Sequence, residues 1–178
     1  MNRRTAIRNV LVISAGAIVL QSCQDKATIT LKRIPITGPD EELVDELGET
    51  IIPKTANFIG ARDLKTREFI FTMADDTLSP ELVETFAKGM KSFDEECKSK
   101  MGSRFIKLSS EKRAEFLRMI EADQKATEFK KETIQFYGMV KYGTIENFTT
   151  SQQYLADVKG ITTLIPPKFQ ACVPVTNS

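Results

Sequence analysis

An apolar stripe in residues 82–101 constrains the fold of this chain more than any other feature. Its members recur every three or four residues, which is the spacing of one face of an α-helix: Leu82, Phe86, Met90, Phe93, Cys97 and Met101. In front of the stripe, Ser79 suits a helix cap, Pro80 the first turn and Glu81 the positive end of the helix dipole. Gly102 behind it suits a helix end. The pattern predicts one long amphipathic helix whose apolar face is covered by other elements.

Helical patterns recur on both sides of this helix. A first helix is expected to be capped by Asp40 and stopped by Pro53, with a loop near 51–64 behind it. Another helix is expected to be capped by Ser109 or Ser110. Three more are expected over residues 63–77, 125–147 and 152–158. Their inner faces are expected to carry Leu43, Leu47 and Ile51, then Phe69, Ile70 and Met73, then Ala114, Leu117 and Ile120, then Phe129, Thr133, Phe136, Val140 and Thr144. No stretch of the domain alternates convincingly like a strand. The predicted fold class is therefore all-α, a compact bundle of about five or six helices in a single domain, residues 40–178.

The N-terminus resembles a secretory leader. Its positive region comprises Arg3, Arg4 and Arg8, and the apolar run at residues 10–20 is shorter than the about 18 residues typical of a membrane span. The adjacent Arg3 and Arg4 resemble a twin-arginine signal, whose export route carries folded proteins. Such a route suits a chain that holds a cofactor or escorts a partner that does. A general secretory signal that begins with two arginines is the alternative.

The leader ends at a candidate lipidation site. Residues 20–23 read Leu-Gln-Ser-Cys, which resembles a bacterial lipobox, so Cys23 is expected to receive lipid after removal of a signal peptide, residues 1–22. An ordinary signal peptide with an incidental cysteine is the alternative. Residues 23–39 have no strong period and are expected to form a lipidated tether. The protein is then expected on the periplasmic side of the cell envelope, anchored to a membrane.

Composition excludes several classes of function. The chain has 25 Lys and Arg against 24 Asp and Glu, interspersed without a basic stripe, so nucleic acid is not an expected partner. It has no histidine, which excludes a Ser-His-Asp triad and histidine ligands for zinc or haem. It also lacks a Gly-x-Gly-x-x-Gly, a P-loop and a Cys-x-x-Cys motif. We therefore expect no catalytic, cofactor-binding or metal-binding residue in this chain.

Adjacent carboxylates occur in three places but are not expected to be catalytic. Neighbours on a helix diverge by about 100°, which is poor geometry for joint acid-base chemistry. We interpret the pairs as solvated helix faces: Glu41 with Glu42, Asp75 with Asp76, and Glu95 with Glu96.

Two cysteines remain after Cys23. Cys97 and Cys172 could pair with each other, pair with another chain, or stay as buried thiols. The apolar stripe favours a buried thiol at Cys97. Cys172 lies in an extended region, which makes it the better candidate for a bond between subunits.

Two kinds of segment are candidates for contact with a partner. A proline-rich tail from about residue 161 is expected to be extended, and it lies either along a partner or over its own bundle. Its candidate docking residues are Pro166, Pro167, Phe169 and Pro174. The three tyrosines could present polar tips at an interface or lie buried: Tyr137, Tyr142 and Tyr154.

Two stretches resemble the gluconate 2-dehydrogenase subunit 3 family. In residues 43–70 a helix ends in Ile-Ile-Pro and a loop with Gly-Ala and an acid leads to a second helix, and the matching residues are Ile51, Ile52, Pro53, Gly60, Ala61 and Asp63. The far end matches at Phe136, Tyr137, Thr150, Ser151, Pro166, Phe169, Cys172 and Pro174. Together these stretches span nearly the whole domain.

The resemblance implies a small subunit of a membrane-associated dehydrogenase for gluconate or related sugars. The large subunit would be a flavin enzyme of the glucose–methanol–choline type with FAD, and a c-type cytochrome often completes such complexes. The small subunit would have no chemistry of its own and would assist maturation, export and membrane anchoring of the large one. A free-standing envelope lipoprotein, acting as a binding or structural module, is the alternative.

Overall fold

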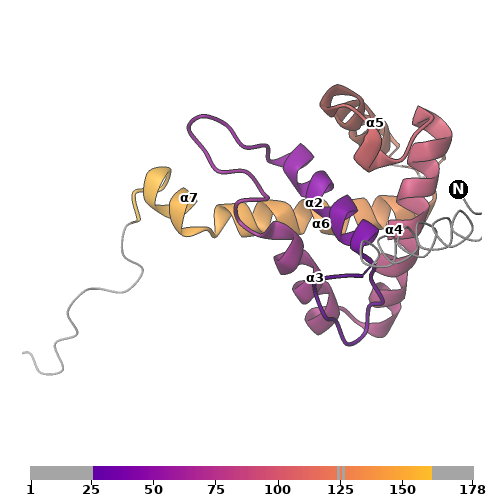
Figure 1. The fold of residues 1–178 in the computed structure, drawn as a ribbon, viewed down its shortest axis with the longest axis horizontal. Helices are drawn as coiled ribbons and strands as arrows, with labels where there is room; N and C mark the ends of the chain where they lie inside the picture. The colour runs from indigo at the N-terminus through magenta and orange to yellow at the C-terminus, as the bar shows by residue number, and fades with distance from the viewer. Residues whose placement is uncertain (1–25, 124, 126, 162–178) are drawn as a thin grey trace, which may run out of the picture.

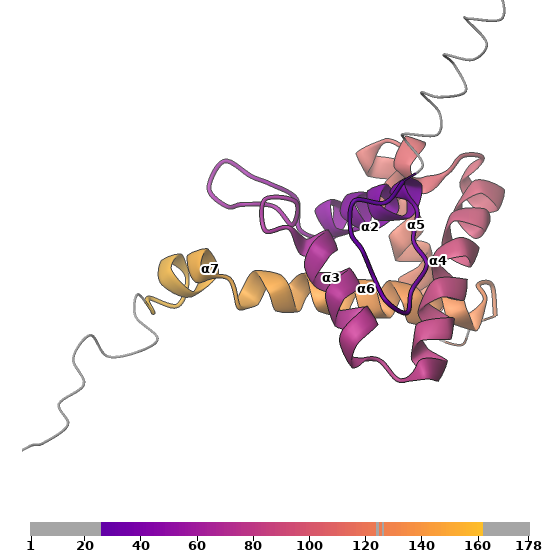
Figure 2. The ribbon, with the colours of Figure 1, turned by 60° about the horizontal axis from the view of Figure 1, so that its bottom comes forward.

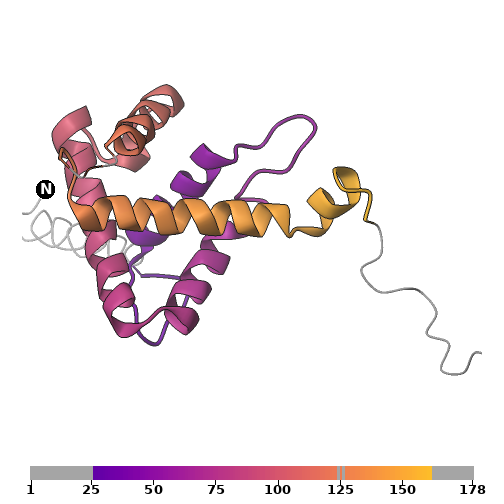
Figure 3. The same cartoon turned by 180° about the vertical axis from the view of Figure 1, so that it is seen from behind.

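A computed structural model describes residues 26–161 apart from 124 and 126, and in this part of the chain the fold is all-α without strands. The elements are α2 (Gly38–Ile51), α3 (Thr66–Thr77), α4 (Pro80–Met101), the short 3-10 helix η1 (Phe105–Lys107), α5 (Ser110–Ala122), α6 (Lys131–Thr149) and α7 (Gln152–Asp157). The predicted fold class is confirmed. The long helix α6 runs behind the others in Figure 1 and is foremost in the reverse view of Figure 3.

The helix predicted from the apolar stripe has the expected ends. Ser79 caps α4 by accepting a hydrogen bond from the backbone N–H of Leu82 at 3.4 Å, and Pro80 occupies the first turn. Gly102 ends the helix in the left-handed region, with φ of 77°. The middle of the stripe is buried, whereas Leu82 at its start is 41% exposed. Local signals therefore determined the length of α4 and most of its inner face, but not its start, where Val83 is buried in place of Leu82.

The most extensive interhelical contact joins α4 and α6. It depends on Gly89, because a Cβ atom there would lie 2.2 Å from the carbonyl oxygen of Glu132 and 2.5 Å from the Cβ of Phe136. At this close approach Phe86 and Phe93 of α4 both pack edge-on against Phe136, with ring centroids 5.1 and 5.7 Å apart. The glycine thus lets the two helices share one aromatic core.

Helix α5 extends the same aromatic core. The Phe93 ring packs edge-on against Phe105 of η1 and Phe116 of α5, each with centroids 5.2 Å apart. Phe116 also packs against Phe129, which lies before α6. Leu117 and Ile120 are buried as expected, but Phe116 is the fully buried member of this helix that the spacing argument did not include.

Two helices begin later than the sequence pattern predicted. Helix α3 begins at Thr66 instead of residue 63, because Lys65 has φ of 52° and interrupts the helical backbone. Its buried face carries Ile70, Phe71 and Ala74, whereas Met73 is 39% exposed. The expectation that Met73 faces inward was wrong.

Helix α6 begins at Lys131 instead of residue 125. The carboxylate of Asp123 accepts hydrogen bonds at 2.8 Å from the backbone N–H groups of Thr127, Glu128 and Phe129. Burial alone would raise the pKa of Asp123, but these hydrogen bonds outweigh it and lower the pKa. They hold the chain in a turn, so Phe129 enters the core from a loop.

Residues 26–37, hereafter the N-terminal strap, are bound to the helical body and cross it on the side facing the viewer in Figure 1 and Figure 2. Ile34 is 2% exposed, and an isolated β-bridge joins Lys26 to Thr37. Helix α2 begins at Gly38, with Thr37 as its cap instead of the predicted Asp40. Asp40 accepts hydrogen bonds from the Thr37 backbone at 2.8 Å and its hydroxyl at 2.7 Å. The described part of the predicted tether is therefore packed.

Two buried carboxylates hold the strap. Glu41 accepts the backbone N–H groups of Thr28 and Ile29 at 2.7 and 2.6 Å and the Thr28 hydroxyl at 2.7 Å. Asp75 accepts the backbone N–H groups of three consecutive residues, Lys32, Arg33 and Ile34, at 2.8, 2.7 and 3.0 Å. Glu41 is 3% exposed and Asp75 4%. The interpretation of these two as solvated was wrong, because each satisfies strap N–H groups that the helices cannot reach.

Replacing Asp75 tests the importance of this attachment. Burial would raise the pKa of Asp75, but the three backbone hydrogen bonds lower it below its ordinary value of 3.8. A group with a lowered folded pKa stabilises the fold above its unfolded pKa, and the effect is lost as pH falls through the folded pKa. We expect Asp75→Asn to lower the free energy of unfolding by about 2 kcal/mol at neutral pH. Urea unfolding between neutral and acidic pH measures this.

The neighbouring Asp76 provides a matched control because its side chain is exposed. Asp76→Asn is expected to change the free energy of unfolding by less than about 0.5 kcal/mol. Equal losses in the two variants would contradict the role of Asp75.

Replacing Gly89 tests the close crossing of α4 and α6. Alanine in a helix is ordinarily more stable than glycine by about 1 kcal/mol. At Gly89 the new methyl group would collide with backbone atoms of α6, so we expect Gly89→Ala to lower the free energy of unfolding by about 3 kcal/mol. Gly138→Ala on α6 is the control, since nothing lies within 4 Å of its Cβ position, and it is expected to stabilise. Denaturation midpoints compare the two, and a stabilised Gly89→Ala would disprove the crossing.

Candidate functional site

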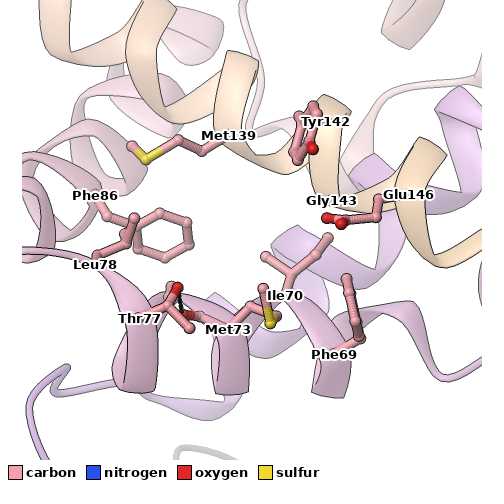
Figure 4. A pocket seen from close by; sticks show the side chains of 11 residues that line it. Phe69, Ile70, Met73, Thr77, Leu78, Phe86, Met139, Tyr142, Gly143 and Glu146 are labelled. Atoms are coloured by element: carbon pink, nitrogen blue, oxygen red, sulfur yellow. Dashed lines mark hydrogen bonds between the residues drawn. The ribbon is translucent and has the colours of Figure 1, made fainter.

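An apolar groove lies between α3 and α6, hereafter the α3–α6 groove (Figure 4). It encloses about 160 Å³. Its lining residues are Phe69, Ile70, Met73, Ala74, Thr77, Leu78, Phe86, Met139, Tyr142, Gly143 and Glu146. All but two of these are apolar or aromatic, or glycine. The groove therefore presents hydrophobic surface to solvent beside the core.

The walls of the groove differ in exposure. Phe86 is fully buried, whereas Met73 on α3 is 39% exposed and Tyr142 on α6 is 68% exposed. Figure 4 places Met73 and Tyr142 on opposite sides, one on each helix. The floor of the groove is thus part of the core, and its two rims are free to contact another molecule.

Gly143 sets how closely the two helices approach. A Cβ atom at this position would lie 3.0 Å from Cγ1 of Ile70, which is tighter than an ordinary contact. Polar groups are few here. The Thr77 hydroxyl is already used, because it donates to the carbonyl oxygen of Met73 at 2.7 Å (Figure 4). Glu146 is the one charged side chain in the lining.

The groove is suited to docking and not to catalysis. One carboxylate beside methionine and phenylalanine side chains offers neither a nucleophile with a base nor an acid-base pair. Exposed methionine and tyrosine are common where proteins bind one another, because methionine adapts its shape and tyrosine has a large apolar ring with a polar tip. The arrangement fits apolar side chains of a partner.

The sequence carried an unused signal for this site. Helix α3 has more apolar residues than one face can bury, so Phe69 and Met73 form a second face beside the core face. On α6, Met139 and Tyr142 likewise lie beside the buried stripe. An apolar excess over one core stripe is the pattern that could have predicted the groove.

A second hollow, lined by α2, α5 and α6, contains polar side chains that pair with one another. The Tyr137 hydroxyl donates to Glu121, and Lys141 Nζ donates to the same carboxylate at 2.6 Å. Burial and the hydrogen bond to Glu121 raise the pKa of Tyr137, so its phenol stays neutral. Of the three tyrosines considered from sequence, Tyr137 is buried, Tyr154 is half-buried and Tyr142 is exposed.

The loop between α2 and α3 is shaped by close backbone approach. A Cβ at Gly60 would lie 2.6 Å from both Oε1 of Glu49 and the backbone nitrogen of Lys54. Ala61 is 2% exposed and donates its N–H to the carbonyl oxygen of Ile52 at 2.9 Å. These contacts explain why the loop contains Gly-Ala after Ile-Ile-Pro.

The same loop packs on the far end of α6 (Figure 1). The ring centroids of Phe58 and Phe148 are 6.4 Å apart, and those of Phe148 and Tyr154 of α7 are 5.3 Å apart. The aromatic row joins loop, α6 and α7 into one unit. Asp63 accepts the N–H of Gly60 at 3.2 Å and so acts in the turn.

In residues 26–161, apart from 124 and 126, no group of histidine, cysteine and carboxylate side chains could hold a metal ion. Among the same residues no helix is both long and apolar enough to cross a bilayer.

Most residues that the sequence singled out lie outside the described residues. They are Arg3, Arg4, Cys23, Pro166, Pro167, Phe169, Cys172 and Pro174. Cys97 is described and is fully buried on α4, where its Sγ donates to the carbonyl oxygen of Ser103 at 3.5 Å. Burial, with a smaller contribution from Asp94, raises its pKa to about 12.

Comparison with known proteins gives a family match over most of the chain. The sequence model described as gluconate 2-dehydrogenase subunit 3 matches residues 39–163. The chain belongs to the gluconate 2-dehydrogenase subunit 3 family. No curated protein and no solved structure matches it.

The match places the main features of the fold within the subunit 3 family. It runs from α2 through α7, so it contains the α3–α6 groove and the loop with Gly60 and Ala61. The resemblance inferred from the sequence is confirmed. The N-terminal strap precedes the matched residues and is held by Glu41 and Asp75, which lie within them.

Chemical labelling tests the state of Cys97 in this subunit 3 protein. Because the thiol is buried and its pKa is about 12, we expect an alkylating reagent to leave Cys97 unmodified in the folded protein and to modify it in denaturant. Mass spectrometry of peptides measures the modified fraction. A cysteine introduced at exposed Gln135 is the control and should react in the folded protein. Reaction of Cys97 at the rate of that control would contradict its burial.

Proposed function

We propose that this chain is a non-catalytic small subunit of a membrane-bound flavin dehydrogenase acting on gluconate or a related sugar. The observation that carries the proposal is the family match over residues 39–163. FAD and the chemistry of oxidation belong to a large subunit of the glucose–methanol–choline type, and a c-type cytochrome is a candidate third subunit. This chain assists maturation of the large subunit, its export and its attachment to the membrane.

The leader supports the proposed roles in export and anchoring. A flavin is loaded before export, so the loaded protein has to cross the membrane folded. The adjacent Arg3 and Arg4 suit a route that carries folded proteins, and the large subunit would travel with this chain. Lipid on Cys23 would then hold the complex at the periplasmic side of the envelope.

The α3–α6 groove supports a docking role. Its exposed rims, Met73 and Tyr142, offer hydrophobic surface of the kind buried between subunits. The tail adds a second contact in this proposal, with Phe169 beside the prolines and Cys172 as an intersubunit thiol. Groove and tail together would hold the large subunit.

Co-purification tests the proposal. A tagged full-length chain is purified in detergent from its native membranes, and the eluate is analysed by mass spectrometry, flavin absorbance and oxidation of gluconate and related sugars. We expect a flavin-bearing dehydrogenase to elute with the chain. Met73→Glu places a carboxylate in the groove near Glu146 and is expected to lower recovery of the flavoprotein about tenfold, the effect of losing roughly 1.4 kcal/mol at an interface.

The control adds the same charge elsewhere. Ser99→Glu adds one negative charge at an exposed position of α4 that does not line the groove, and it is expected to leave recovery unchanged. Equal recovery with Met73→Glu would remove the groove from the interface but leave the subunit role standing. Elution of the intact chain without any flavoprotein would instead favour the free-standing envelope lipoprotein.

A further inference from the structure

The N-terminal strap has a consequence for how the protein sits on a membrane. We propose that the strap, with its exposed lysines, lies against the lipid headgroups, so that the helical body rests on the bilayer in one orientation. The inference rests on the proposed lipidation of Cys23. The strap's proposed partner is the phospholipid surface, as indicated by the strap's attachment to the body, the short chain before it and its positive charge.

The attachment leaves little free chain. Thr28 and Ile29 are bound to Glu41 through backbone and hydroxyl hydrogen bonds, and Lys32 to Ile34 are bound to Asp75. Ile34 is buried at 2% exposure. Releasing the strap would remove the hydrogen bonds that Thr28 and Ile29 donate to buried Glu41 and that three strap residues donate to buried Asp75, which is costly. A lipid anchor on Cys23 would therefore hold the helical body through the strap, and not through a free tether that ends at residue 40.

The chain before the strap is short. From Cys23 to Lys26 is three residues, which span at most about 11 Å when fully extended. A domain of this size has a radius of gyration of about 14 Å. Acyl chains in the bilayer would fix Cys23 at the headgroup level. A body held on so short a link cannot stand clear of the surface, and the part nearest the link is the strap.

The strap has the composition that this position requires. Its exposed residues include Lys26, Thr30 and Lys32, whereas Ile29 and Leu31 between them pack against the core. No acidic residue occurs between 26 and 37. Lysine and threonine suit phosphate-rich headgroups, and lysines near a membrane are attracted to anionic lipids.

The orientation leaves α6 on the side away from the bilayer. The strap faces the viewer in Figure 1, whereas α6 is foremost from behind in Figure 3. With the strap on the headgroups, the exposed rim at Tyr142 of α6 is accessible to a partner in the aqueous phase. The geometry would thus anchor one face and leave another open.

Site-specific quenching tests this orientation in the full-length, lipidated protein. Single cysteines are introduced as Thr30→Cys on the strap or Gln135→Cys on α6, both in a Cys172→Ser background, and are labelled with an environment-sensitive fluorophore. The protein is reconstituted in vesicles of phosphatidylethanolamine and phosphatidylglycerol that contain a headgroup-linked nitroxide. We expect several-fold stronger quenching at position 30 than at position 135.

A linker variant separates the effect of tether length from lipidation itself. Inserting a Gly/Ser linker of about 12 residues between Asp25 and Lys26 adds a root-mean-square reach of about 20 Å and is expected to reduce the difference between the two labels. Equal quenching at both positions in vesicle-bound protein, or stronger quenching at position 135, would overturn the orientation alone. Failure of the chain to float with vesicles would overturn the lipoprotein proposal, and the orientation with it.

Discussion

The close crossing of α4 and α6 is the contact on which the rest of the structure depends. Gly89 has no side chain, so the backbone of α4 approaches Glu132 closely enough for the phenylalanines of both helices to interlock. Helices α2 and α3 then pack against α6, and α5 covers the aromatic core through Phe116. Any side chain at the crossing would separate the helices and open the core, because such interiors are closely packed.

Buried carboxylates complete the fold where helices cannot. Glu41, Asp75 and Asp123 accept backbone N–H groups of segments that have no regular structure. A carboxylate can accept several hydrogen bonds at once, so one side chain fixes the path of several residues. In this way the helical body determines where the N-terminal strap runs and where α6 begins. The hydrogen bonds of Glu41 and Asp75 to the strap therefore contribute both to the stability of the fold and to the proposed orientation on the membrane.

The features relevant to function lie on different parts of this scaffold. The loop with Gly60 and Ala61 is shaped by backbone contacts, which explains these small residues without assigning them chemistry. The α3–α6 groove lies where Gly143 lets two helices approach. The docking role proposed for this chain needs rigid surfaces of this kind. The fold supplies hydrophobic rims on a closed core.

The sequence alone determined the all-α class, both ends of α4, the buried stripe of α6 and the family. These follow from local caps and helical spacing, which act between residues a few positions apart. Tertiary structure decided the rest. From the sequence, Asp75 is expected to be a solvated acid. In the structure, the strap, about forty residues earlier in the chain, donates three backbone N–H groups to it. The α3–α6 groove likewise exists only because helices distant in sequence meet: the apolar excess on α3 and α6 is present in the sequence, but it does not say which helices come together.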